Sequence, residues 1–205
     1  MQFSNIELKT TNKDFATSKA RNTNGIKEYL HNHLEEFKTF EFFIGDTLNV
    51  ESTFYFLDKN LPGLQKEKGR DKLIIDIIYL ARLFLKQVKS KRIQIQLEVV
   101  TTNMCRLFHA DNIRQRLLCT YLGPGTEWLD YSNVNWNGLG KGCNKKIAKD
   151  MSKINHVETN KTILLYGIKH ETELPIVHRS PEIEKTSATR VLLKIDECQL
   201  EEEHV

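Results

Sequence analysis

His109, Asp111 and His178 are the residues whose types and spacing point most directly to chemistry. His109 and Asp111 lie two positions apart in LFHADNI, and His178 follows after 178 − 109 = 69 residues, in IVHRSP. Two imidazoles and one carboxylate make up the facial triad of mononuclear non-haem iron sites. Residues two apart on a strand share one face, so His109 and Asp111 are expected to reach one ion. The three residues are predicted to be metal ligands and catalytic residues.

A basic residue follows the second histidine at a suggestive distance. Arg190 comes 190 − 178 = 12 residues after His178, at the start of an apolar run that is typical of a strand. A guanidinium pairs with a carboxylate through two parallel hydrogen bonds. Arg190 is therefore predicted to bind one carboxylate of a dicarboxylic cosubstrate, and Lys194, on the same strand face, is the reserve candidate.

The segment GPGTEW contains further candidates. Gly123-Pro124-Gly125 indicates a tight turn, and such turns often carry functional side chains. Trp128 is expected to form a wall of the substrate pocket, with Glu127 beside it. Thr126 and Tyr121 are expected to hydrogen-bond the cosubstrate. An equally weighted alternative makes Trp128 a packing residue that closes the end of a barrel.

The first half of the chain shows helical periodicity. Apolar residues at helical spacing predict an amphipathic helix over 26–37 and a longer one over 71–91. Between them, VESTFYFL at 50–57 is interpreted as a possible strand. A broad apolar stripe such as that of 71–91 usually faces the protein's own core.

The second half shows strand patterns. In RIQIQLEVVT (92–101) apolar and polar residues alternate, and strands are also predicted at 113–122, 162–168, 173–178 and 189–196. Helices followed by strands favour an α+β fold with an antiparallel, barrel-like core. We predict one domain at 25–198, with a mainly helical part at 25–91 and a β core at 92–198. A poorly ordered arm at 1–24 and an acidic tail at 199–205 flank it.

Composition and charge indicate the class of protein and its expected location. With 40% hydrophobic and 28% charged residues, the 205-residue chain resembles a soluble globular protein, and a net charge of +3 gives no electrostatic argument for nucleic acid. The most apolar stretch, at 73–85, is too short for a bilayer, so no membrane association is predicted. The four scattered cysteines and the polar start of the chain favour reduced thiols and a cytoplasmic location.

These motifs resemble those of the iron(II)/2-oxoglutarate-dependent dioxygenases, which share an H-x-D…H triad and a basic residue about one strand beyond the last histidine. The resemblance implies a double-stranded β-helix (jelly-roll, cupin-like) core with the N-terminal helices packed outside. It also implies Fe(II) bound by His109, Asp111 and His178, with 2-oxoglutarate as cosubstrate held by Arg190.

The chain also resembles an uncharacterised bacterial domain-of-unknown-function family. The match lies in C-R-x-x-H-x-D at 105–111, RLLCTYLGPGTEWL at 116–129 and VHRSP at 177–181, and it covers about 104–196. This resemblance supports the site and leaves both the reaction and the substrate open.

Two other functional hypotheses stay open at this point. The same three ligands could hold zinc or another divalent ion in a non-catalytic, cupin-like protein of metal homeostasis. Alternatively, the site is vestigial and the amphipathic helices form a protein-interaction surface. A zinc site at Cys105 and His109 lacks a second ligand pair at suitable spacing. His156 and His170 are lower-ranked substitutes for a triad member, and no G-x-S-x-G motif indicates a serine hydrolase.

Overall fold

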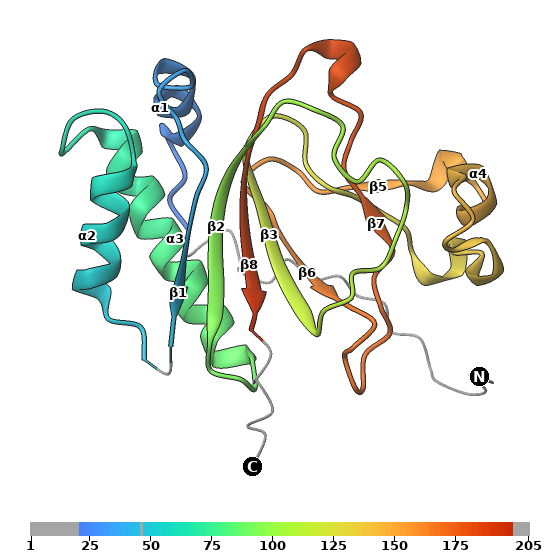
Figure 1. The fold of residues 1–205 in the computed structure, drawn as a ribbon. Coiled ribbons are helices and arrows are strands. Elements are labelled where there is room, and N and C mark those ends of the chain that lie inside the picture. Colours follow the sequence, from blue (N-terminus) through green and yellow to red (C-terminus); the bar gives the residue numbers. More distant parts are fainter. Residues whose placement is uncertain (1–20, 46, 199–205) are drawn as a thin grey trace.

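The computed structural model describes residues 21–45 and 47–198, which form a mixed α/β fold. Helices cover one face of a five-stranded antiparallel sheet, and a three-stranded antiparallel sheet lies on its other side (Figure 1). None of the helices in this part of the chain is both long and apolar enough to cross a membrane. The predicted tail at 199–205 and most of the predicted arm lie outside the described residues.

Three helices form the first layer: α1 (Ile26–Asn32), α2 (Val50–Asn60) and α3 (Lys68–Gln87). α3 confirms the long predicted helix. The helix expected over 26–37 ends at Asn32 instead, and the chain then enters strand β1 (Phe40–Ile44). The strand interpretation of 50–57 is wrong, because Asn49 caps α2 by accepting a hydrogen bond from the Ser52 N–H.

The large sheet has the strand order β1-β2-β8-β3-β6. Its members besides β1 are β2 (Ile93–Val100), β3 (Gln115–Leu122), β6 (Thr162–Tyr166) and β8 (Arg190–Glu197), close to the predicted strands. One face, with Ile95, Leu117 and Leu193, packs on the helices in the main core. Because side chains alternate along a strand, Arg116, Leu118, Thr120 and the even-numbered residues of β8 lie on the opposite face.

The small sheet contains β4 (Glu127–Trp128), β5 (Asn155–His156) and β7 (His178–Arg179) in the order β5-β4-β7. An isolated antiparallel bridge joins His109 to His178 and so adds the His109 segment beyond β7. A small apolar cluster fills the space between the two sheets, with Leu118 and Leu192 on the large sheet and Trp128 on the small one. The functional side chains discussed below lie around this cluster.

A layer of short elements covers the far side of the small sheet (Figure 1). Phe108, Leu129 and Val177 pack there against Val134 and Ile147. The elements are α4 (Asn144–Ile147) and 3-10 helices at Tyr131–Asn133, Trp136–Gly138 and Met151–Lys153, while a further 3-10 helix, Glu184–Thr186, precedes β8. The sequence gives no periodic signal for this layer, because its Asn-, Gly- and Lys-rich segments contain few apolar residues.

Arg21, at the start of the described chain, is fixed to the core. Its guanidinium donates to both carboxylate oxygens of Asp76 in α3, at 2.8 and 2.6 Å. The hydroxyl of Tyr121 donates to the same carboxylate at 2.6 Å. This buried ion pair ties the segment before α1 to α3 and β3.

Candidate metal centre

Two backbone hydrogen bonds place the two predicted histidine ligands side by side. The His109 N–H donates to the His178 carbonyl at 3.0 Å, and the His178 N–H donates to the His109 carbonyl at 2.9 Å. Residues paired across such a bridge project their side chains in the same direction, and the two imidazole centroids lie 4.6 Å apart. The bridge therefore brings together two residues that are distant in the sequence.

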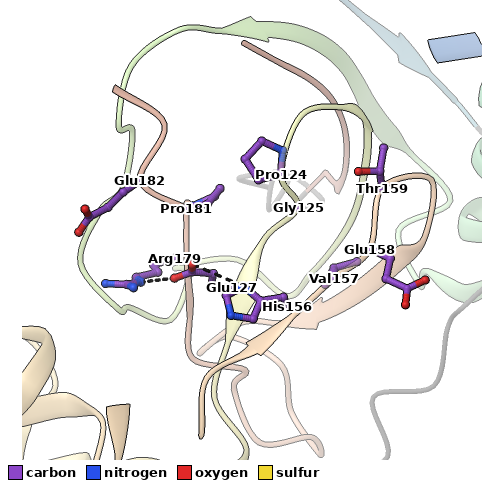
Figure 2. Close-up of a pocket in the computed structure, with 10 residues that line it drawn as sticks. All are labelled: Pro124, Gly125, Glu127, His156, Val157, Glu158, Thr159, Arg179, Pro181 and Glu182. Carbon is purple, nitrogen blue, oxygen red and sulfur yellow. Dashed lines mark hydrogen bonds and ion pairs between the residues drawn. The ribbon is translucent and has the colours of Figure 1, made fainter. Parts of the chain in front are cut away.

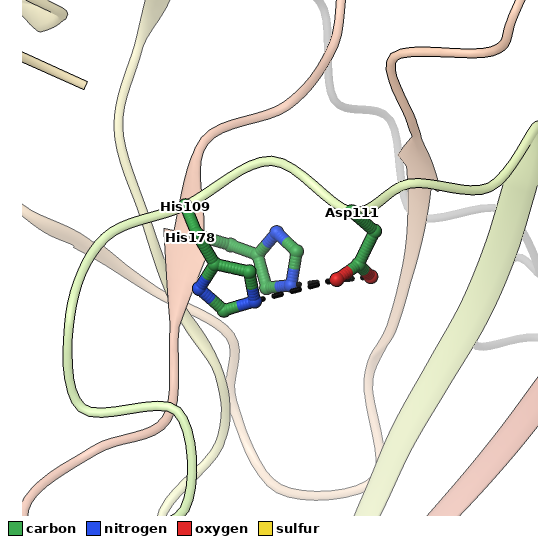
Figure 3. Close-up of side chains that lie close together, drawn as sticks. All are labelled: His109, Asp111 and His178. Carbon is green, nitrogen blue, oxygen red and sulfur yellow. Dashed lines mark ion pairs between the residues drawn. The ribbon is translucent and has the colours of Figure 1, made fainter. Parts of the chain in front are cut away.

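Asp111 completes the group (Figure 3). His109 Nε2 lies 3.3 Å from Asp111 Oδ1, and His178 Nε2 lies 3.5 Å from Asp111 Oδ2. One possible ligand atom from each residue lies within 4.8 Å of the others. His109 and Asp111 were expected on a regular strand, but both lie in the loop between β2 and β3, apart from the single bridge at His109.

The remaining ring nitrogens indicate how the imidazoles are protonated. His109 Nδ1 lies 2.8 Å from the Leu107 carbonyl, and His178 Nδ1 lies 3.1 Å from the Ile176 carbonyl. A carbonyl oxygen can only accept, so each Nδ1 carries the proton and donates. When the imidazole is neutral, its Nε2 then has a lone pair directed toward the shared space, as in histidines that bind a metal.

Burial and nearby charges shift the pKa values of all three residues. Burial lowers the pKa of His178 to about 4, against the opposing charge of Asp111. Burial raises the pKa of Asp111, but the hydrogen bond with His109 and the nearby charges of His178 and Arg116 outweigh it and bring the value to about 2. The hydrogen bond with Asp111 raises the pKa of His109. At neutral pH the site offers an ionised carboxylate and a neutral His178.

Arg190 begins β8, as predicted, and is only 1% exposed. Its guanidinium donates to Ser180 Oγ at 3.4 Å and to Thr120 Oγ1 at 3.2 Å, while its Nε has no hydrogen-bond acceptor within the described part of the chain. Ser180 lies two residues after His178, so its side chain faces the same interior. Burial lowers the pKa of Arg190 to about 10, which leaves a buried cation with no ion-pair partner among the described residues.

Two other predicted cosubstrate residues are placed differently. Lys194 lies on the same face of β8 as Arg190, but its Nζ contacts Glu98 Oε1 at 2.8 Å. Tyr121 is fully buried on the helix-facing side of β3, where it donates to Asp76, so its predicted role at the metal-facing side is wrong. Thr120, its neighbour, presents the hydroxyl to that side instead.

The GPGTEW segment divides between two faces of the small sheet. Trp128 packs in the cluster between the sheets, and Thr126, two residues earlier, is buried. Glu127 points the other way and forms an ion pair with Arg179 at 2.6 Å. It lines an open cavity of about 560 Å³ with His156 and Pro181 (Figure 2). Because Arg179 and His178 are adjacent on β7, this cavity lies on the face opposite to His178.

The other histidine candidates lie away from the triad. The His156 side chain is 64% exposed and lies 3.5 Å from Glu127. The Nδ1 of His170 accepts hydrogen bonds from the backbone of Thr172 and Glu173. Within residues 21–45 and 47–198, His109, Asp111 and His178 are the one group with three ligand atoms close enough for a shared ion.

Three residues at this site are not among those predicted from the sequence: Arg116, Thr120 and Ser180. Arg116 and Thr120 alternate with Leu117 and Tyr121 along β3, and nothing in the alternation says which face meets the metal-ligand residues. Ser180 lies two residues beyond His178. That spacing was the one signal that could have identified it.

Solved structures with resembling folds include several oxygenases. A rice dioxygenase for auxin oxidation is 11% identical, with a TM-score of 0.47, over 77% of this chain and 55% of the rice chain. Its Arabidopsis thaliana counterpart, in complex with 2-oxoglutarate, is 13% identical, with a TM-score of 0.40, over 86% and 72% of the two chains. The Fe(II)/α-ketoglutarate-dependent dioxygenase TqaL is 12% identical, with a TM-score of 0.44, over 85% and 74%. This chain thus spans little more than half of the rice enzyme.

Likenesses this distant assign no activity. No curated protein shows a significant sequence match. In contrast, residues 10–196 match the family described as "Protein of unknown function (DUF1826)", which covers nearly the whole chain and includes every residue of the site. The chain belongs to the DUF1826 family.

Proposed function

We propose that this protein is a non-haem iron(II) oxygenase that uses 2-oxoglutarate as cosubstrate. One observation carries the proposal: a ligand group of two histidines and one aspartate shares its interior with a buried arginine that has no anionic partner among the described residues. The triad fits ferrous iron. The unpaired guanidinium fits the distal carboxylate of a 2-oxo diacid.

The topology supports a double-stranded β-helix around this site. From β2 onward the chain passes between the sheets in the order large, small, large, small, small, large, small, large, counting the His109 segment as a strand. The first of these eight segments pairs with the last (β2 with β8), and the second with the seventh (His109 with β7). Likewise β3 pairs with β6 and β4 with β5. Nested pairing of this kind is expected for a jelly roll of eight strands in two Greek keys, and so it supports that assignment.

The donor set suits a divalent ion that must keep open positions. The Nε2 atoms of His109 and His178 and one oxygen of Asp111 would hold iron on one side. When bound, iron supplies the redox chemistry that couples reduction of dioxygen to oxidative decarboxylation of 2-oxoglutarate and oxidation of a substrate. The protein holds, orients and shields the reactants.

The residues of the interior divide these tasks. Arg190 binds the distal carboxylate of 2-oxoglutarate, with the hydroxyls of Thr120 and Ser180 beside it. Lys194 contributes little, because Glu98 already compensates its charge. Trp128 and the apolar cluster around it exclude water from the site.

Turnover without added substrate tests the proposal. Purified protein with Fe(II), ascorbate and 2-oxoglutarate in air is expected to form succinate slowly, and His178→Ala is expected to form none. His156→Ala is the matched control, because this histidine is exposed and outside the triad. Stoichiometric metal binding without succinate would instead favour the non-catalytic metal-binding protein, with zinc as its first candidate ion.

A further inference from the structure

Asp111 makes a second strong contact that the metal site alone does not require. Arg116 Nη1 donates to Asp111 Oδ2 at 2.7 Å. The same guanidinium binds Asp196 in a fork, with Nε to Oδ1 at 2.5 Å and Nη2 to Oδ2 at 2.7 Å. Arg116 thus bridges two carboxylates, and only one of them belongs to the predicted ligand set.

The bridge is rigidly placed. Arg116 and Asp196 are paired residues on the neighbouring strands β3 and β8, so both backbones fix the guanidinium. All three side chains are largely buried, with exposures of 20% for Arg116, 16% for Asp196 and 13% for Asp111. A planar guanidinium held at one side by a fork keeps its remaining N–H groups in a fixed direction. Asp111 Oδ2 is therefore held in place from the β8 side.

This contact limits what Asp111 can offer to an ion. Its Oδ2 accepts from Arg116 and also lies 3.5 Å from His178 Nε2, whereas Oδ1 lies 3.3 Å from His109 Nε2. An octahedral ion bound by two histidines and one carboxylate oxygen keeps about three free positions, which suffice for a two-atom chelate and dioxygen. If both carboxylate oxygens bound the ion, about two positions would remain, too few for both reactants.

We propose that Arg116, held by Asp196, is a positioning residue that restricts Asp111 to one coordinating oxygen and so keeps one coordination position open. This inference rests on the metal site of the proposed function. It adds a task for two residues that touch neither metal nor cosubstrate. Arg116 stabilises the open arrangement at some loss of metal affinity, because a guanidinium beside the ion repels it.

The two effects of removing Arg116 have opposite signs, which separates positioning from general structural damage. In Arg116→Met both oxygens of Asp111 become available and a repelling charge is lost, so the metal is expected to bind as tightly as before or more tightly. The number of metal-bound waters is expected to fall. A merely structural role would weaken metal binding and leave the water number of the bound ion unchanged.

The experiment uses Mn(II) as a probe with the 205-residue chain and measures metal affinity and water proton relaxation. Wild type is expected to keep about three rapidly exchanging waters on bound Mn(II), and Arg116→Met about two, a loss of about one third of inner-sphere relaxivity. Arg114→Met is the matched control. Arg114 lies two residues earlier, is also 20% exposed and pairs with Glu171 and Glu197 instead. It is expected to behave as wild type.

Three outcomes overturn the inference. Equal water numbers in wild type and Arg116→Met would do so while leaving the metal site intact. A similar fall in the number of metal-bound waters in Arg114→Met would show that loss of a positive charge, and not loss of the Arg116 bridge, causes the change. Absence of Mn(II) binding to wild type would reject the metal site and the inference together. If Arg116→Met does not fold, Arg116→Gln replaces it, because its amide tolerates the polar setting but is too short to span both carboxylates.

Discussion

Arg190 is a buried cation that costs folding free energy and that we propose as the binding residue for the cosubstrate carboxylate. Its guanidinium is buried beside two hydroxyls, with an unsatisfied Nε and no carboxylate partner in the described part of the chain. A buried charge without a partner costs folding free energy, and an apolar replacement of similar shape often recovers part of it. The distal carboxylate of the proposed cosubstrate would supply the missing anionic partner.

Replacing Arg190 therefore gives a two-part prediction. Arg190→Met is expected to raise the free energy of unfolding by roughly 1–3 kcal/mol in the absence of ligands and to weaken 2-oxoglutarate binding by roughly 30-fold or more. Urea unfolding and calorimetric titration measure the two effects. Lys194→Met is the control: it leaves Glu98 unpaired, so it is expected to lower stability and to leave 2-oxoglutarate binding nearly unchanged. Loss of binding in the Lys194 variant alone would reassign the anchor.

His178 gives a pH prediction for the metal-free protein. Its pKa is about 4 in the folded state, because burial lowers it from the ordinary histidine value of 6.5. Between these values the unfolded chain binds more protons at this residue, so stability falls as pH decreases from 6.5 toward 4. At pH 5 the loss is about 2 kcal/mol relative to pH 7.5. Urea unfolding with a chelator should show this loss in wild type beyond that in His178→Gln, and equal losses would contradict the assigned burial.

At the scale of elements, a close approach of backbones positions the Asp111 loop. Gly167, just after β6, donates its N–H to the Arg114 carbonyl, and the Ile168 N–H donates to the Asp111 carbonyl at 2.9 Å. A Cβ at Gly167 would lie 2.2 Å from the Ile113 carbonyl oxygen and 2.7 Å from that of Asp111. A side chain there must displace the loop that carries Asp111.

Gly167→Ala is accordingly expected to damage the site from a distance. We expect metal affinity to fall by roughly tenfold or more, because supporting residues of metal ligands contribute on that scale. Gly45→Ala is the matched control, since no atom of the described residues beyond its chain neighbours lies within 4 Å of its added Cβ, and its φ is not positive. Mn(II) titration of the two variants makes the comparison, and unchanged affinity in Gly167→Ala would show that the loop adapts without moving its ligand.

The elements also show which parts of the fold were readable from sequence. Alternation at 92–101 and the broad stripe at 71–91 each record burial, so β2 and α3 were predicted close to their observed bounds. VESTFYFL has strand-like composition, yet the Asn49 cap and the burial of Thr53 and Leu57, four residues apart, make it helical. In β3 the pattern revealed two faces without saying which one meets the metal-ligand residues. The sequence alone therefore predicts Tyr121 at the position that Thr120 occupies in the structure.

The whole molecule brings the candidate site together from segments that are far apart in sequence. His109 follows β2, His178 begins β7 and Arg190 begins β8. An antiparallel bridge makes the two histidines neighbours, and the Arg190 guanidinium reaches Ser180, two residues beyond His178. The H-x-D…H spacing predicts that His109, Asp111 and His178 come together because metal chemistry restricts residue types, and their side chains do lie close to one another. The layer at 131–154 was missed because nothing in its composition has a helical or strand period.

A metal bound across these segments is expected to stabilise the whole fold. Ligand at about 100 times its Kd adds about 2.7 kcal/mol to the free energy of unfolding, which corresponds to a rise in Tm of roughly 5–10 °C for a chain of this size. Thermal unfolding with Mn(II) and then with excess chelator measures the shift. His109→Ala should show none, and an equal shift in that variant would place the metal elsewhere.

The most direct test of the central claim is anaerobic titration with Fe(II) in the presence and absence of 2-oxoglutarate, followed by visible absorption. The account predicts a weak metal-to-ligand charge-transfer band that requires both components and disappears in His178→Ala and Arg190→Ala. Such a band reports chelation of the 2-oxo acid by iron at this site. Iron binding without any band would contradict the assignment of this protein as a 2-oxoglutarate-dependent oxygenase, and a band that persists in both variants would contradict the assigned site.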